Sequence, residues 1–94
     1  MADDDKLRSA LNRAAHANDL LGNELLAEAY DKIESDLVTA WVNSEPRDSD
    51  GRERVWNAVQ ANRKHKRFLQ NIIDDGKIAQ VELDRLIQNE RKRA

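Results

Sequence analysis

Helix-breaking residues are rare in this chain, and their positions most constrain how it can fold. The only proline is Pro46, and the three glycines are Gly22, Gly51 and Gly76. The stretches between them are rich in helix-favouring residues and show few runs of alternating β-branched side chains. The sequence therefore predicts an all-α protein whose helices end near these four residues.

The segment 23–43 has the clearest helical pattern. Its apolar residues recur at steps of four, three, four and three, at Leu26, Tyr30, Ile33, Leu37 and Ala40. An average spacing of about 3.5 residues holds one helix face against a neighbouring helix. Asn23 is a favourable N-cap, and Pro46 ends the helix because a residue before proline avoids the α region.

A second long helix is expected over residues 50–75. Two adjacent lines of apolar residues run along it, and the stripe that they form is interrupted at Asn62 and Lys66. Asp48, or the serine after it, can cap the start of this helix. Gly76 fits the position just beyond its end, where glycine is favoured, so we expect the helix to stop there.

The loop between these two helices is short, and such loops are typical of antiparallel neighbours. We therefore predict an antiparallel two-helix hairpin over residues 23–75, with shorter helices at 1–22 and 77–94, in a single helical domain covering residues 1–94. Apolar residues make up 39% of the chain and charged residues 36%. A core this sparse predicts that a second copy or another protein completes it, so we expect an oligomer.

The predicted contact surface lies on this hairpin. It combines the large apolar residues of the regular stripe with the two tryptophans beside the loop: Leu26, Tyr30, Ile33, Leu37, Trp41 and Trp56. An antiparallel hairpin brings Trp41 and Trp56 to the same end. They can close the core at the turn, which is the more usual role, or one of them can be exposed as the anchor of an interface.

Charge is divided unevenly along the chain. Residues 1–50 hold 5 Lys/Arg against 12 Asp/Glu, whereas residues 51–94 hold 11 against 6. The sharpest feature is the basic run at 63–67, in which Arg63, Lys64, Lys66 and Arg67 are candidates for binding DNA phosphates. Consecutive residues point all around a helix, however, so only two or three of them can face the same phosphates. Salt bridges to the acidic second helix are the alternative that we favour.

No residue pattern in the chain indicates catalysis, a metal site or a cofactor. Cysteine is absent, His16 and His65 lack partners at metal-ligand spacing, and no glycine-rich phosphate loop occurs. We therefore predict a non-enzymatic protein without a cofactor. The acidic start is unlike a signal peptide, and no stretch is long and apolar enough to span a bilayer, so we expect no membrane association.

The residues around the predicted loop resemble those of a known group of proteins. From Ala29 to Leu86 the chain contains the motifs A-Y-x-x-I-E-x-x-L-V-x-A-W, G-R-E-R-V-W, H-x-x-x-L and D-G-K-I-A-x-x-E-L-x-x-L. These motifs resemble small uncharacterised helical proteins encoded in the structural or packaging gene region of tailed phages and prophages. The matching positions are Trp41, Asp48, Gly51, Arg52, Glu53, Trp56, Asp75, Gly76 and Lys77.

The resemblance implies a biological context rather than a site. It covers the last two thirds of the chain and implies the host cytoplasm or the virion, with phage or host proteins as partners. Together with the hairpin, it predicts a non-enzymatic accessory protein that acts in head assembly or DNA packaging by helix-mediated oligomerisation. Two alternatives stay open: a nucleic-acid-binding packaging subunit that uses the basic run, and an acidic inhibitor of a host protein that uses Asp31, Glu34 and Asp36.

Overall fold

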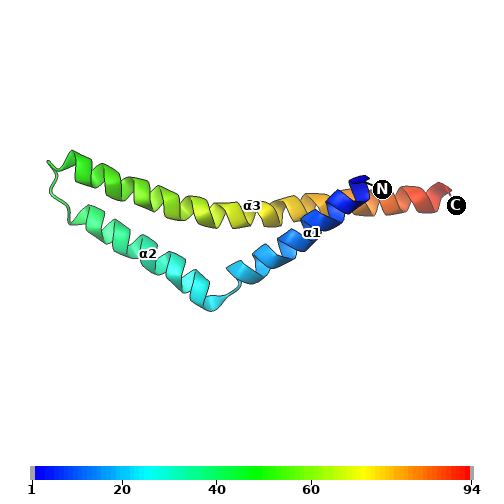
Figure 1. The fold of residues 1–94 in the computed structure, drawn as a ribbon, viewed down its shortest axis with the longest axis horizontal. Coiled ribbons are helices and arrows are strands. Elements are labelled where there is room, and N and C mark those ends of the chain that lie inside the picture. Colours follow the sequence, from blue (N-terminus) through cyan, green and yellow to red (C-terminus); the bar gives the residue numbers. More distant parts are fainter. Residues whose placement is uncertain (1, 94) are drawn as a thin grey trace. The chain divides into compact units, whose positions relative to one another are not determined.

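The computed structural model describes residues 2–93, and these form three α-helices without a β-strand (Figure 1). The helices are α1 (Ala2–Leu21), α2 (Glu24–Val42) and α3 (Ser49–Arg93). The predicted all-α class is confirmed. Across the described residues the helices are too short or too polar to cross a lipid bilayer.

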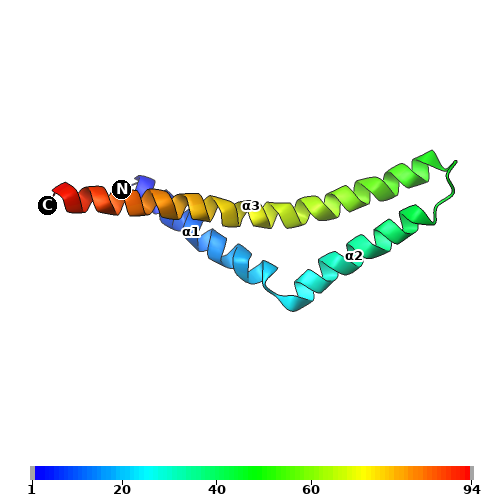
Figure 2. The ribbon, with the colours of Figure 1, turned by 180° about the vertical axis from the view of Figure 1, so that it is seen from behind.

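The described residues divide into two compact units that share α3. Unit 1 comprises the residues up to Leu20 and those from Leu69 onward, and unit 2 comprises Leu21–Phe68. Unit 1 therefore pairs α1 with the last part of α3, and unit 2 pairs α2 with the first part (Figures 1 and 2). Each unit has its own packing and is described separately.

Side-chain caps begin α2 and α3 where the sequence predicts them. The Asn23 side chain accepts a hydrogen bond of 3.0 Å from the Leu26 N–H. The Asp48 side chain accepts one of 3.0 Å from the Gly51 N–H. Each cap satisfies an N–H group that has no partner within its helix, and so fixes where that helix starts.

The predicted helix end at Gly76 is wrong, and so is the separate helix predicted at 77–94, because α3 continues to Arg93. Gly76 is buried, and no described glycine has the positive φ of a left-handed helix cap. A Cβ atom placed on Gly76 would overlap the Cβ of Ala14 on α1. Because Gly76 has no side chain, α1 and α3 can approach one another closely at this position. The glycine does not end a helix.

Small side chains form the core of unit 1. Ala17 is 3% exposed, Ala79 4% and Leu83 6%, and Gly76 is buried with them. Gly76, Ala17 and Ala79 are small, so the backbones of α1 and α3 can lie close together beside them, and Leu83 adds one large side chain to this core.

Unit 2 is packed differently. Val59 of α3, which is 2% exposed, is its only buried hydrophobic residue among those described. Helix α2 contains no buried residue. Apart from Val59, the large apolar side chains of this unit are therefore half-buried or exposed.

Candidate interaction surface

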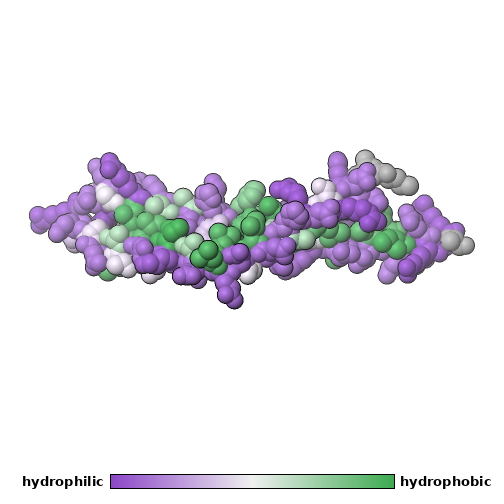
Figure 3. All heavy atoms as spheres, turned by 60° about the horizontal axis from the view of Figure 1, so that its bottom comes forward, coloured by the Kyte–Doolittle hydropathy of each residue, from purple (hydrophilic) through white to green (hydrophobic). Residues whose placement is uncertain are grey.

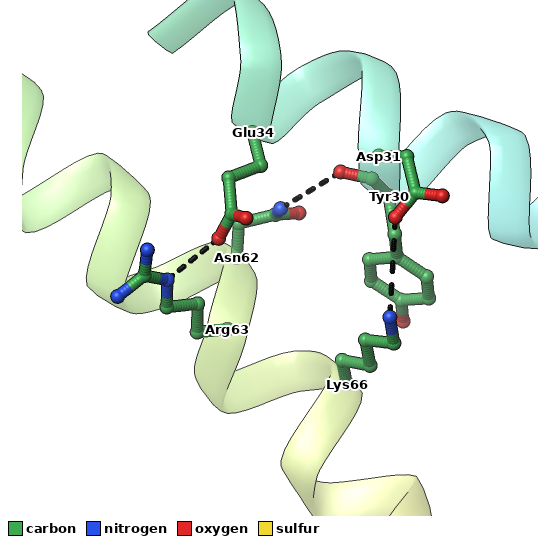
Figure 4. Close-up of polar contacts among 6 residues, drawn as sticks. All are labelled: Tyr30, Asp31, Glu34, Asn62, Arg63 and Lys66. Atoms are coloured by element: carbon green, nitrogen blue, oxygen red, sulfur yellow. Dashed lines mark hydrogen bonds and ion pairs between the residues drawn. The ribbon is translucent and has the colours of Figure 1, made fainter. Parts of the chain in front are cut away.

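Polar side chains connect α2 to α3 in the middle of unit 2 (Figure 4). The Asn62 side-chain amide donates a hydrogen bond of 3.1 Å to the Tyr30 carbonyl. Arg63 Nε lies 2.6 Å from Glu34 Oε1. Lys66 Nζ lies 4.0 Å from the carboxylate of Asp31. The positions that interrupt the apolar stripe of α3 are therefore the positions that make polar contacts with α2.

Arg52 connects the two helices beside the loop. Its guanidinium carbon lies 4.1 Å from the centre of the Trp41 ring, a cation–π contact. The same guanidinium donates a hydrogen bond of 3.0 Å to the Ser44 hydroxyl. It also lies 3.5 Å from the carbonyl oxygens of Trp41 and Ser44. A cation placed here complements the negative end of the α2 dipole and its unpaired carbonyl groups.

An apolar pocket opens between α2 and α3 close to the loop. We call it the Trp pocket, and it has a volume of about 260 Å³ and is lined by Val38, Trp41, Val42, Trp56, Val59 and Arg63. Trp41 is 37% exposed, Val38 41%, Trp56 50% and Val42 65%. Figure 3 shows apolar side chains gathered toward the loop end of unit 2. Four large apolar residues on neighbouring helices thus share one solvent-facing surface.

The predicted contact residues fall into two groups. Leu26, Tyr30 and Leu37 are half-buried, whereas Ile33, Trp41 and Trp56 are exposed. The tryptophans therefore do not close a core at the turn, because each keeps a third or more of its surface in solvent. Their place on the Trp pocket supports the second role that the sequence left open, exposure at an interface.

Val38 and Val42 belong to the Trp pocket, although the sequence prediction did not include them. A local signal for them exists. They lie four residues apart on α2 and flank Trp41, so they occupy the same helix face as one another. This second apolar line is shorter than the regular stripe through Leu37, so it is harder to recognise in the sequence.

The basic run is divided by the fold. Arg63 and Lys66 pair with Glu34 and Asp31 of α2, as the salt-bridge alternative expects. Lys64 and Arg67 are exposed, and neither forms an ion pair with another described residue. The four candidate DNA-contacting residues therefore do not present a single free basic face.

The three acidic side chains of α2 that the inhibitor alternative would use are also paired within the chain. Besides the pairs of Asp31 and Glu34, Asp36 accepts a hydrogen bond of 2.8 Å from Lys32. Across the part of the chain that the structure describes, no three His, Asp or Glu side chains gather in a way that could hold a metal ion.

Comparisons with protein-family models, with curated proteins and with solved structures find no match to this chain. The Trp pocket and its charged surroundings are therefore the features of the molecule from which a function can be proposed.

Proposed function

We propose that this chain is a non-enzymatic accessory protein of a tailed phage or prophage. It acts in head assembly or DNA packaging by helix-mediated oligomerisation, in the host cytoplasm or the virion. The observation that supports this proposal best is the Trp pocket, where two tryptophans and two valines of neighbouring helices face solvent together. Single exposed apolar residues are normal on soluble proteins, but contiguous ones are typical of binding sites.

In this proposal unit 2 acts as an antiparallel two-helix hairpin that presents the pocket. The order of its contacts supports the arrangement, because partners on α3 come earlier in the chain as their partners on α2 come later. Asp31 pairs with Lys66, Glu34 with Arg63, and Trp41 with Arg52. The ion pairs and the Arg52 contacts hold the pocket open at the loop end, so that both indole rings remain available to a partner.

Tryptophan is the residue type best suited to this role. It buries a large apolar area, about 150–250 Å², when a partner covers it, and it loses little side-chain entropy. Trp is also enriched among the few interface residues that contribute most binding energy. Trp56, which is 50% exposed, is therefore the residue whose loss should weaken association most.

Analytical ultracentrifugation across a wide concentration range tests the oligomer. We expect a concentration-dependent dimer or larger species, and Trp56→Ala should raise its dissociation constant by about 30-fold or more. Val81→Ala is the matched control, because Val81 is 70% exposed but lies in unit 1. A wild-type chain that stays monomeric at the highest concentration would contradict the proposal.

The biological context has its own test. Deleting the gene from the phage or prophage should leave host lysis intact and reduce the fraction of DNA-filled heads seen by electron microscopy. A Trp56→Ala allele should reproduce part of this defect. A normal fraction of filled heads after deletion would remove head assembly and packaging from the proposal.

One observation favours the nucleic-acid-binding packaging subunit as a second candidate. Phe68, which is 59% exposed, lines an open hollow together with Lys64 and His65. An aromatic face beside a cation can stack on an unpaired base while the cation contacts a phosphate. Fluorescence anisotropy with labelled single-stranded DNA should show binding that Phe68→Ala and Lys64→Ala weaken and that salt abolishes. Absence of binding at low salt would eliminate this candidate.

A further inference from the structure

We propose that the partner covering the Trp pocket is a second copy of this chain, placed so that α2 of each copy faces α3 of the other and both loops lie at the same end. This inference rests on the proposed oligomerisation and deepens it by naming the occupant and its orientation. It follows from the distribution of charge around the pocket.

The pocket face continues away from the loop as a charged surface. On α2, Asp31 precedes Val38 by seven residues and Glu24 precedes Val42 by eighteen, so both carboxylates lie on the pocket side of the helix. The Asp31 side chain is 79% exposed even though it lies near Lys66. The α2 side of the face is therefore apolar beside the loop and acidic farther from it.

The α3 side of the same face is basic. Arg63 lines the pocket, and Arg67 follows it by one helical turn. The whole helices show the same division. Helix α2 holds five acidic residues and one basic residue, whereas residues 49–68 of α3 hold six basic and two acidic. The ion pairs within the chain are partly exposed, so both signs of charge remain open to a partner.

A face with one acidic helix and one basic helix is complementary to a copy of itself. Two copies related by a twofold axis can stack face to face in two ways. If the axis runs along the helices, α2 faces α3 of the other copy, opposite charges meet, and the Trp pockets cover one another. If the axis runs across the helices, each helix faces its own equivalent and like charges meet. Like-charge contacts across an interface are strongly unfavourable, so the first arrangement is preferred.

The size of the face is adequate for a stable dimer. Helix α2 has 19 residues and is about 28 Å long. Two neighbouring helices, each about 10 Å across, make the face about 20 Å wide. This footprint is about 560 Å² for each copy, or about 1,120 Å² in total, which is smaller than a standard interface but above the ~1,000 Å² expected of a biological one.

A distance measurement between spin labels tests the arrangement in the full chain. The chain has no cysteine, so Glu24→Cys provides a single labelling site at the end of α2 opposite the loop. Glu24 lies seventeen residues, about 26 Å along the helix, from Trp41. The proposed dimer brings the two labelled positions to the same end, with about 14 Å between their helix axes, whereas the crossed arrangement places them at opposite ends of the overlapping helices, roughly 30 Å apart.

The possible outcomes distinguish a failure of the proposed arrangement from a failure of oligomerisation itself. A short label distance, in a labelled chain that ultracentrifugation shows to be dimeric, supports the arrangement. A long distance in a dimer overturns the arrangement but leaves the oligomer standing. A monomer for both the wild-type and the labelled chain overturns both proposals.

Charge reversal provides a second test that does not depend on labels. Arg67→Glu should raise the dimer dissociation constant by about tenfold at low salt, and the effect should shrink at high salt because counter-ions screen exposed charges. Arg54→Glu is the matched control, since it makes the same charge change two residues before Trp56, on the other side of α3. Equal effects of the two variants would overturn the inference, because overall charge would then explain both.

Discussion

Each of the two units of this chain packs two helices side by side, but the two units use different side chains to do so. Unit 1 contains three of the four buried hydrophobic residues that the structure describes, and two of the three are alanines. Unit 2 contains a single buried hydrophobic residue, Val59, and all four aromatic side chains of the chain. Its helices are connected by Arg52, Asn62 and Arg63.

The difference indicates a division of roles. Unit 1 buries part of its apolar surface in its own core, although Leu20, Ile78 and Val81 remain exposed. Unit 2 keeps its aromatic side chains and most of its large branched ones half-buried or exposed, which is the basis for proposing that a partner covers them. The difference in packing between the two units can be tested, because Trp41 and Trp56 both lie in unit 2. Tryptophan fluorescence therefore follows unit 2, whereas far-UV circular dichroism follows all the helices.

Leu83→Ala should give the largest loss of stability, because Leu83 is 6% exposed in the closed core of unit 1. We expect about 2–4 kcal/mol, the combined cost of lost burial and a cavity. In urea unfolding, the circular dichroism transition should move more than the fluorescence transition. Val81→Ala, at a position that is 70% exposed, should change the free energy of unfolding by less than about 0.5 kcal/mol. Equal shifts for the two variants would contradict a closed core.

Gly76→Ala tests the close packing of the same unit and should cost about 1–3 kcal/mol through overpacking. The sign of the change in unfolding free energy is diagnostic, because replacing glycine by alanine stabilises a helix by about 1 kcal/mol where space allows. Ala14→Gly, which removes the overlapping Cβ, should restore part of the loss in the double variant. If Gly76→Ala instead stabilises the chain, α1 and α3 do not approach one another here.

Arg52→Ala should have a smaller effect that is confined to unit 2. Losing the cation–π contact with Trp41 and the hydrogen bond to Ser44 should cost about 1–2 kcal/mol. The tryptophan emission of the folded chain should change as well, since the guanidinium stacks on that ring. The exposed Arg54 provides the control, and Arg54→Ala should change neither quantity measurably.

The ion pair between Glu34 and Arg63 should contribute least. Both side chains are more than a third exposed, so a double-mutant cycle with Glu34→Gln and Arg63→Gln should give a coupling of about 0.2–1 kcal/mol. This coupling should largely vanish in 1 M salt, where screening is strong. A coupling of several kcal/mol that persists in salt would mean that polar contacts, and not incomplete apolar packing, dominate unit 2.

The parts of the fold that depend on local chemistry could be predicted from the sequence. Asn23 and Asp48 cap their helices because a short side chain can reach an N–H three residues ahead, whatever the rest of the chain does. The end of α2 before Pro46 is local for the same reason. The roles of these residues could be predicted without any knowledge of tertiary packing.

The parts that depend on a distant residue could not be predicted. A glycine can end a helix or admit a neighbouring helix, and only the position of Ala14 decides which role Gly76 has. Asn62 and Lys66 interrupt an apolar stripe, and their purpose appears only when Tyr30 and Asp31 are placed opposite them. The exposure of both tryptophans likewise depends on how far α2 and α3 enclose them, which no short motif specifies.

The continuity of α3 gives the chain a means of thermodynamic coupling. Starting a helix is the unfavourable step of its formation, with an equilibrium constant of about 10⁻³, whereas adding residues to an existing helix is close to neutral or favourable. Residues 69–93 extend a helix that begins at Ser49, so they need no nucleus of their own once residues 49–68 are helical. A partner that binds the Trp pocket would therefore favour the folded state of unit 1 through the shared backbone.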